Sequence, residues 1–160
     1  MDVDGVLTDG QIIYSEKGDE IKAFNVQDGL GITLARMAGL KTGIITGRHS
    51  DLVERRALEL KMDVISQGNF SKLPEYEKIK NELNLSDDEI AYIGDDILDL
   101  PVLKRVGFSV AVANARDEVK AACDYVTVNS GGKGAVREVI DKILKRQDKF
   151  YQLMEQLDAR

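Results

Sequence analysis

The chain contains one cysteine, one histidine, no run of 18 apolar residues and no long run of lysine or arginine. A single cysteine cannot form an internal disulfide, and the lack of a long apolar run argues against a membrane-spanning helix. With 22 basic and 28 acidic residues, the formal net charge is −6. That charge argues against a nucleic-acid groove and against an anionic membrane surface as partners. We therefore expect a cytoplasmic protein whose partner is a small molecule.

The length of 160 residues suits one domain, 1–160, with a core of its own. Short apolar runs alternate with helical patterns, which predicts an α/β fold with a mainly parallel sheet covered on both faces. The expected strands are 40–46, 63–66, 90–94, 108–113 and 125–128. The expected helices are 28–39, 50–60, 73–83, 99–105 and a long C-terminal helix with its tail, 135–160.

The first residues of the chain carry its most informative pattern. Asp2 and Asp4 alternate with Val3, so in an extended segment their side chains share one face. A second acidic pair, Asp95 and Asp96, follows the expected strand 90–94. Close carboxylates repel by up to about 4 kcal/mol per pair at an effective dielectric near 20, so such a cluster needs a cation. Oxygen ligands alone favour Mg²⁺.

Other interpretations of the sequence are weaker. An EF-hand loop is not supported, because Val6 and Leu7 stand where that loop requires an Asx-type ligand and then a glycine, and no glutamate stands at its twelfth position. The glycine-rich stretch 131–134 lacks the serine or threonine of a Walker A loop, although a tight turn before a helix could suit an anion. We interpret Cys123 as buried filler and His49 as a surface residue.

One segment departs from the alternation of strands and helices. Residues 11–24 predict a β-hairpin directly after the acidic turn. Two interpretations of this segment stay open. It is either an ordinary edge hairpin or a flap that contacts the substrate or a neighbouring subunit.

Four motifs, in order along the chain, resemble those of the haloacid-dehalogenase-type phosphohydrolases. Each follows or ends an expected strand. They are DVDGVLT at 2–8, GIITGR at 43–48, QGNFSK at 67–72 and GDDILD at 94–99. The resemblance covers nearly the whole chain and implies a Rossmann-like three-layer α/β/α sandwich with a β-hairpin flap.

The resemblance also implies roles for the reacting residues. Asp2 would attack phosphorus, and Asp4 would protonate the leaving oxygen and then deprotonate water. Lys72 would hold the phosphoryl group and Asp2. The metal Mg²⁺ would be held by Asp2, the backbone carbonyl of Asp4 and Asp95. The remaining implied site residues bind phosphate (Thr46, Gly47) or orient the metal ligands and Lys72 from outside (Asp96, Asp99).

Three further segments narrow the resemblance to phosphatases of 3-deoxy-D-manno-octulosonate (KDO) 8-phosphate. They are 8–10, FNVQDG at 24–29 and GGKGAVRE at 131–138. The implied activity is Mg²⁺-dependent hydrolysis of this sugar phosphate for lipopolysaccharide synthesis. A nine-carbon sialic-type sugar phosphate remains an alternative substrate. A non-catalytic oligomerising or regulatory module remains an alternative of another class.

The spacing of the motifs leaves no room for a cap domain, because one hairpin and one helix account for the chain between Asp4 and Thr46. We therefore expect substrate specificity to come from the hairpin, from Arg48 and from a neighbouring subunit. Arg48 is the candidate for the sugar carboxylate, since a guanidinium binds it bidentately. The resemblance implies a homotetramer. In this fold the nucleophile ends a central strand, and only Met1 precedes Asp2, so we expect that strand to be incomplete in the sequence given.

Overall fold

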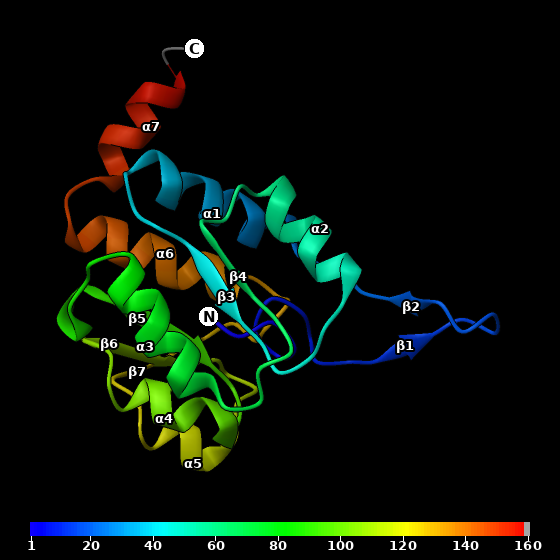
Figure 1. Ribbon diagram of the computed structural model, residues 1–160. Helices are drawn as coiled ribbons and strands as arrows, with labels where there is room; N and C mark the ends of the chain where they lie inside the picture. The colour runs from blue at the N-terminus through cyan, green and yellow to red at the C-terminus, as the bar shows by residue number, and fades with distance from the viewer. Residues whose placement is uncertain (159–160) are drawn as a thin grey trace.

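The computed structural model describes residues 1–158 (Figure 1). A short hairpin comes first, and every later strand is separated from the next by helix. The strands are β1 (Ile13–Tyr14), β2 (Glu20–Ile21), β3 (Gly43–Ile45), β4 (Val64–Ser66), β5 (Ala91–Gly94), β6 (Phe108–Ala111) and β7 (Tyr125–Val126). The helices are α1 (Val26–Met37), α2 (Asp51–Glu59), α3 (Lys72–Glu82), α4 (Leu100–Leu103), α5 (Asp117–Lys120), α6 (Ala135–Arg146) and α7 (Phe150–Asp158), with 3₁₀ turns at Asp87–Glu89 and Ile97–Asp99.

The parallel strands form two groups that the start of the chain joins. β3 pairs with β4, and β6 pairs with β5 on one side and β7 on the other, all in parallel. The amide of Ile45 donates to the carbonyl oxygen of Met1, and the amide of Asp2 donates to the carbonyl oxygen of Ile93, each at 3.0 Å. Residues 1–2 therefore lie between β3 and β5. Asp2 is thus placed at the centre of the sheet.

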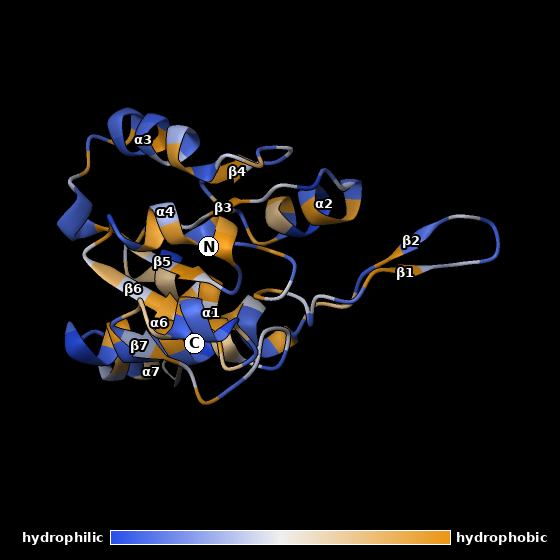
Figure 2. Cartoon of the chain, turned by 90° about the horizontal axis from the view of Figure 1, so that it is seen from below, coloured by the Kyte–Doolittle hydropathy of each residue, from blue (hydrophilic) through white to orange (hydrophobic). Residues whose placement is uncertain are grey.

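Helices cover both faces of the sheet, as the view in Figure 2 shows. α1 and α6 pack against each other on one face, and α3 and α4 lie on the other. Because helices cover both faces, the strands need apolar residues on both sides. Ile44, Ile93 and Val110 are accordingly almost fully buried. The predicted α/β fold with a mainly parallel sheet is confirmed. No helix within residues 1–158 is long and apolar enough to cross a membrane.

The C-terminal segment differs from the single long helix that its apolar stripe predicts. α6 ends at Arg146 and α7 begins at Phe150, because Asp148 adopts a left-handed conformation with a φ of +56°. This break turns the chain back, so that Leu153 of α7 is buried against the core. The last two residues of the expected tail, 159–160, lie outside the described residues.

Two other expectations need correction. The one-turn helix α5 was not predicted, since four residues are too few to give a helical apolar pattern. The hairpin is present but narrower than 11–24, with only two residues in each strand. It projects from the body of the molecule (Figure 1), so few neighbours are available to extend its pairing.

Candidate active site

The chain reverses direction directly after Asp2. The amides of residues 6–8 all donate to the carbonyl oxygen of Val3, which closes a tight turn. Gly5 has a φ of +90°, and a Cβ there would overlap Oδ2 of Asp95. Because a left-handed conformation costs other residues about 1–2 kcal/mol, glycine is required here for both backbone geometry and space. The turn thereby brings Asp95 against the start of the chain.

Lys72 joins two acidic side chains in the interior. Its Nζ lies 2.8 Å from Oδ2 of Asp2 and 2.7 Å from Oδ1 of Asp99. Burial alone would lower the pKa of Lys72, but the charges of the two carboxylates outweigh it and raise that pKa. Burial, followed by the charge of Asp99, raises the pKa of Asp2, while Lys72 opposes the rise. Lys72 is therefore a charged ammonium that compensates this part of the cluster.

Asp95 lacks such compensation. Its Oδ1 is buried and has no hydrogen-bond partner among the described residues. Burial first, then the charges of Asp2 and Asp99, raises the pKa of Asp95 to about 7. Asp2, Asp95 and Asp99 each offer a carboxylate oxygen, and these oxygens all lie within 4.8 Å of one another. An unpartnered carboxylate in an acidic, oxygen-lined cluster fits a hard divalent cation.

Asp99 is the residue that organises this cluster. Its Oδ1 also accepts from the hydroxyl of Tyr92 at 2.9 Å, and its Oδ2 accepts from the amides of Asp95 and Asp96. It is fully buried. The side chain of Asp96 is exposed and accepts from the amide of Ile97, so it caps the following 3₁₀ turn. The sequence did not predict the contact of Tyr92 with Asp99, because a tyrosine within an apolar strand is interpreted as a residue of the hydrophobic core.

The hairpin supplies a partner to Asp4 that sequence reasoning also missed. Nζ of Lys22 lies 2.6 Å from Oδ1 of Asp4 and 3.5 Å from Oε1 of Glu20. Glu20 also accepts from Arg48 at 2.8 Å and from Ser50 at 2.7 Å. The bond from Ser50, and the charges of Lys22 and Arg48, hold the pKa of Glu20 below its usual range. The signal in the sequence was the alternation at 20–22, which places two opposite charges on one face.

The phosphate-binding candidates lie on the same edge of the sheet as Asp2. Thr46 follows β3 directly, and its amide donates to the carbonyl oxygen of Ser66 at the end of β4. Since Ile45 pairs with Met1, the loop that carries Thr46, Gly47 and Arg48 begins beside the acidic turn. The loop after β3 thus lies at the same edge of the sheet as the acidic turn.

A polar contact behind the acidic turn was not anticipated. Nδ2 of Asn114 donates to the carbonyl oxygen of Gly5 at 3.0 Å, and its Oδ1 accepts from the amide of Gly131 at 2.6 Å. A Cβ at Gly131 would overlap the carbonyl oxygen of Gly5. The stretch 131–134 therefore supports the turn through close backbone contact.

The stretch 131–134 forms a turn before α6, but a side chain occupies the N-terminus of that helix, where the sequence left room for an anion. The buried carboxylate of Asp28 accepts from the amides of Gly134 at 3.3 Å and Arg137 at 2.8 Å. Two other side chains lie largely as interpreted, although Cys123 is only partly buried. His49 is exposed, and burial raises the pKa of the Cys123 thiol to about 11, which disfavours a reactive thiolate.

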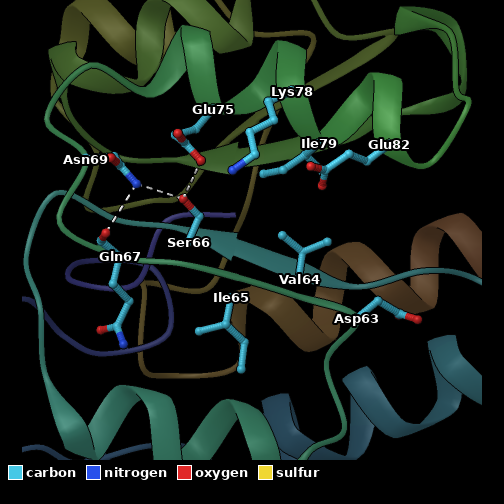
Figure 3. Close-up of a pocket in the computed structure, with 10 residues that line it drawn as sticks. All are labelled: Asp63, Val64, Ile65, Ser66, Gln67, Asn69, Glu75, Lys78, Ile79 and Glu82. Atoms are coloured by element: carbon cyan, nitrogen blue, oxygen red, sulfur yellow. Dashed lines mark hydrogen bonds between the residues drawn. The ribbon is translucent and has the colours of Figure 1, made fainter.

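A cavity of about 480 Å³ lies elsewhere, between β4 and α3 (Figure 3). Ser66 sits at its centre, donates to Glu75 and accepts from Asn69, as the dashed lines mark. Its acidic and basic lining residues include no member of the buried carboxylate cluster. We therefore place the candidate active site at Asp2, Asp95 and Lys72.

Comparison with known proteins identifies the family of this chain. A family model described as haloacid dehalogenase-like hydrolase matches residues 56–140. The KDO 8-phosphate phosphatase KdsC of Escherichia coli (strain K12) is 46% identical over 150 residues, which cover 94% of this chain and 80% of that protein. The chain belongs to the haloacid dehalogenase-like hydrolases.

This member of the family is also similar to solved structures of phosphatases that contain bound ligands. The KDO 8-phosphate phosphatase of Moraxella catarrhalis, in complex with magnesium, phosphate and KDO, is 45% identical and superposes with a TM-score of 0.96. The alignment covers 98% of this chain and 90% of that one. The cobalt-bound enzyme of Haemophilus influenzae is 42% identical, with a TM-score of 0.89 over 93% of this chain and 87% of that one.

Proposed function

We propose that this protein is a Mg²⁺-dependent phosphatase that hydrolyses KDO 8-phosphate to KDO and inorganic phosphate. The observation that carries the proposal is the convergence of Asp2 and Asp95 with Lys72 in the interior. Its relatives of known name, at 46% identity over most of the chain, are phosphatases of this sugar phosphate. Oδ1 of Asp95 is buried and has no hydrogen-bond partner among the described residues, which fits a bound Mg²⁺. The relative from Moraxella catarrhalis contains a magnesium ion.

The proposed reaction has two steps, each assigned to residues of this chain. A carboxylate oxygen of Asp2 forms a bond to phosphorus while the bond to the sugar oxygen breaks, and Asp4 donates a proton to that oxygen. Asp4 then takes a proton from water, whose oxygen attacks phosphorus and releases Asp2 and phosphate. Asp2, Asp95 and the backbone carbonyl of Asp4 would hold Mg²⁺, which would supply positive charge against the charge of the phosphoryl group.

The remaining residues would hold the substrate. We assign the phosphoryl oxygens to the hydroxyl of Thr46, the amide of Gly47 and the ammonium of Lys72. Asp96 and Asp99 orient the ligands and Lys72 from outside. Arg48 is assigned to the sugar carboxylate, and its buried Nη1, which has no partner among the described residues, supports a role in binding.

We also propose a homotetramer in which neighbouring subunits contribute to each site. The apolar side chains of the hairpin support this assembly, because Ile12, Ile13, Tyr14 and Ile21 are all at least 42% exposed. We further propose one functional domain, 1–160, and a cytoplasmic location. The buried apolar side chains of residues 1–158 form one cluster, which supports the former, and the lone, half-buried cysteine is compatible with the latter.

Phosphate release from a panel of sugar phosphates tests the proposal. The panel contains KDO 8-phosphate, a nine-carbon sialic-type 9-phosphate, a hexose 6-phosphate and p-nitrophenyl phosphate, each assayed with Mg²⁺ and with a chelator. We expect the highest kcat/KM for KDO 8-phosphate and no turnover with the chelator. A preference for the nine-carbon substrate would replace the proposed sugar. No turnover of any substrate would favour the non-catalytic module.

A further inference from the structure

Lys22 is a buried ammonium on an otherwise exposed hairpin. Only 1% of its side chain is exposed, whereas the neighbouring Ile21 and Ala23 are exposed. An isolated ammonium would lose several kcal/mol on leaving water, so burial requires carboxylate partners. Lys22 has two of them, Asp4 at 2.6 Å and Glu20 at 3.5 Å.

The second partner is itself fixed in place. Glu20 accepts from Arg48 through Oε1 and from Ser50 through Oε2. A chain of polar contacts therefore runs from the start of α2, through the hairpin, to Asp4. Because Lys22 is buried between two carboxylates and Glu20 is held by Arg48 and Ser50, the position of the Lys22 ammonium is well defined.

We propose that Lys22 is a positioning residue that holds Asp4 for proton transfer to the leaving oxygen. The inference rests on the proposed function, in which Asp4 is the general acid and base. The ammonium contacts Oδ1 of Asp4, which leaves Oδ2 to exchange the proton. As Asp4 gives up its proton to the sugar oxygen, a carboxylate forms, and the adjacent Lys22 stabilises that developing charge.

This role predicts a dependence on the leaving group. A sugar alkoxide is a poor leaving group and needs the proton, whereas p-nitrophenolate leaves without one. In a reaction with a covalent intermediate, kcat/KM covers the steps up to release of the leaving group and excludes hydrolysis of the intermediate. The ratio of kcat/KM values therefore isolates the proton transfer by Asp4 in the first step. A purely structural role for Lys22 would affect both substrates alike.

The test compares Lys22→Met, Lys22→Arg and a control, Lys17→Met, in the full chain with Mg²⁺. Lys17 is exposed on the same hairpin, so its variant removes a charge from the segment without touching Asp4. General acid catalysis contributes about 10²–10⁴-fold. We expect Lys22→Met to lower kcat/KM for the sugar phosphate by about tenfold or more, and that for p-nitrophenyl phosphate by no more than about twofold.

Lys22→Arg should recover most of the lost activity, because it restores a cation next to Asp4. Equal losses on both substrates, or no loss on the sugar phosphate, would overturn the proposal. Its failure can be told apart from that of the proposed function. The wild-type protein alone tests the preferred sugar, and the ratio between variant and wild type can be measured on any alkyl phosphate that the enzyme turns over.

Discussion

Nζ of Lys72 lies 2.8 Å from Oδ2 of Asp2, and both side chains are largely buried. The two residues come from different segments, the start of the chain, which lies between β3 and β5, and the first turn of α3. Their contact compensates the negative charge that Asp2 must carry to act as a nucleophile. Oδ1 of Asp2 accepts from the amide of Val3 at 2.7 Å. The two oxygens of the carboxylate thus have separate partners, which fix its orientation.

Asp2→Asn should abolish turnover and leave the fold intact. The amide has nearly the same shape, and Lys72 keeps its contact with Asp99, so we expect the free energy of unfolding to change by about 1 kcal/mol or less. Loss of a group that acts in a concerted catalytic set costs on the order of 10⁴-fold or more in kcat. Phosphate release and thermal unfolding measure the two effects, and full activity would contradict the covalent mechanism.

Lys72→Met should lose both activity and stability, unlike Asp2→Asn, which should lose activity alone. It leaves Asp2 and Asp99 buried together without the ammonium that lies between them. Removing one partner of a buried ion pair costs about 3–5 kcal/mol. Urea unfolding of this variant beside Asp2→Asn checks the expectation, and equal stability of the two variants would argue against it.

The sequence was sufficient to locate the main strands because buried parallel strands read as short apolar runs between helices. The sequence also located the acidic groups, because polar residues that follow parallel strands meet at one edge of the sheet. Lys22 and Tyr92 were missed because their roles depend on contacts with distant segments. The break before α7 was missed because the left-handed conformation of Asp148 leaves the apolar periodicity unchanged.

Asp95 should make the metal-free protein less stable above about pH 7. Its pKa is about 7 in the folded chain and about 3.9 in an unfolded chain. Between these values the folded state binds more protons, so stability falls as the pH rises through this window, and the loss is complete above it. Asp95→Asn removes this effect. We expect a rise in Tm of about 3 °C or more at pH 8, with a smaller rise at pH 5.

Magnesium supplies the control for this prediction. Mg²⁺ that binds the folded state should raise the Tm of the wild-type protein at pH 8 by mass action, and should have little effect on Asp95→Asn. Thermal unfolding with and without Mg²⁺ at both pH values measures these shifts. If Asp95→Asn were less stable than the metal-free wild type at pH 8, the proposed cost of ionising Asp95 in the folded protein would be contradicted.

Gly131→Ala should damage the active site from behind. Its Cβ would overlap the carbonyl oxygen of Gly5, so the acidic turn must move, and both kcat and stability should fall. Gly39→Ala is the matched control, because Gly39 has a φ of +82° and open space around it. That variant should lose about 1 kcal/mol of stability from backbone strain and keep its kcat. Equal kcat for both variants would argue against the steric effect.

The exposed apolar side chains of the hairpin predict that assembly depends on this segment. Ile13 is 42% exposed and Tyr14 is 61% exposed, and an isolated two-stranded hairpin is only marginally stable in water. We expect the double variant Ile13→Ser, Tyr14→Ser to lower the mass measured by light scattering from about four chains toward fewer. Tyr151→Ser is the control, because Tyr151 is 69% exposed on α7 rather than on the hairpin. An unchanged mass in the hairpin variant would mean that the subunits associate through another surface.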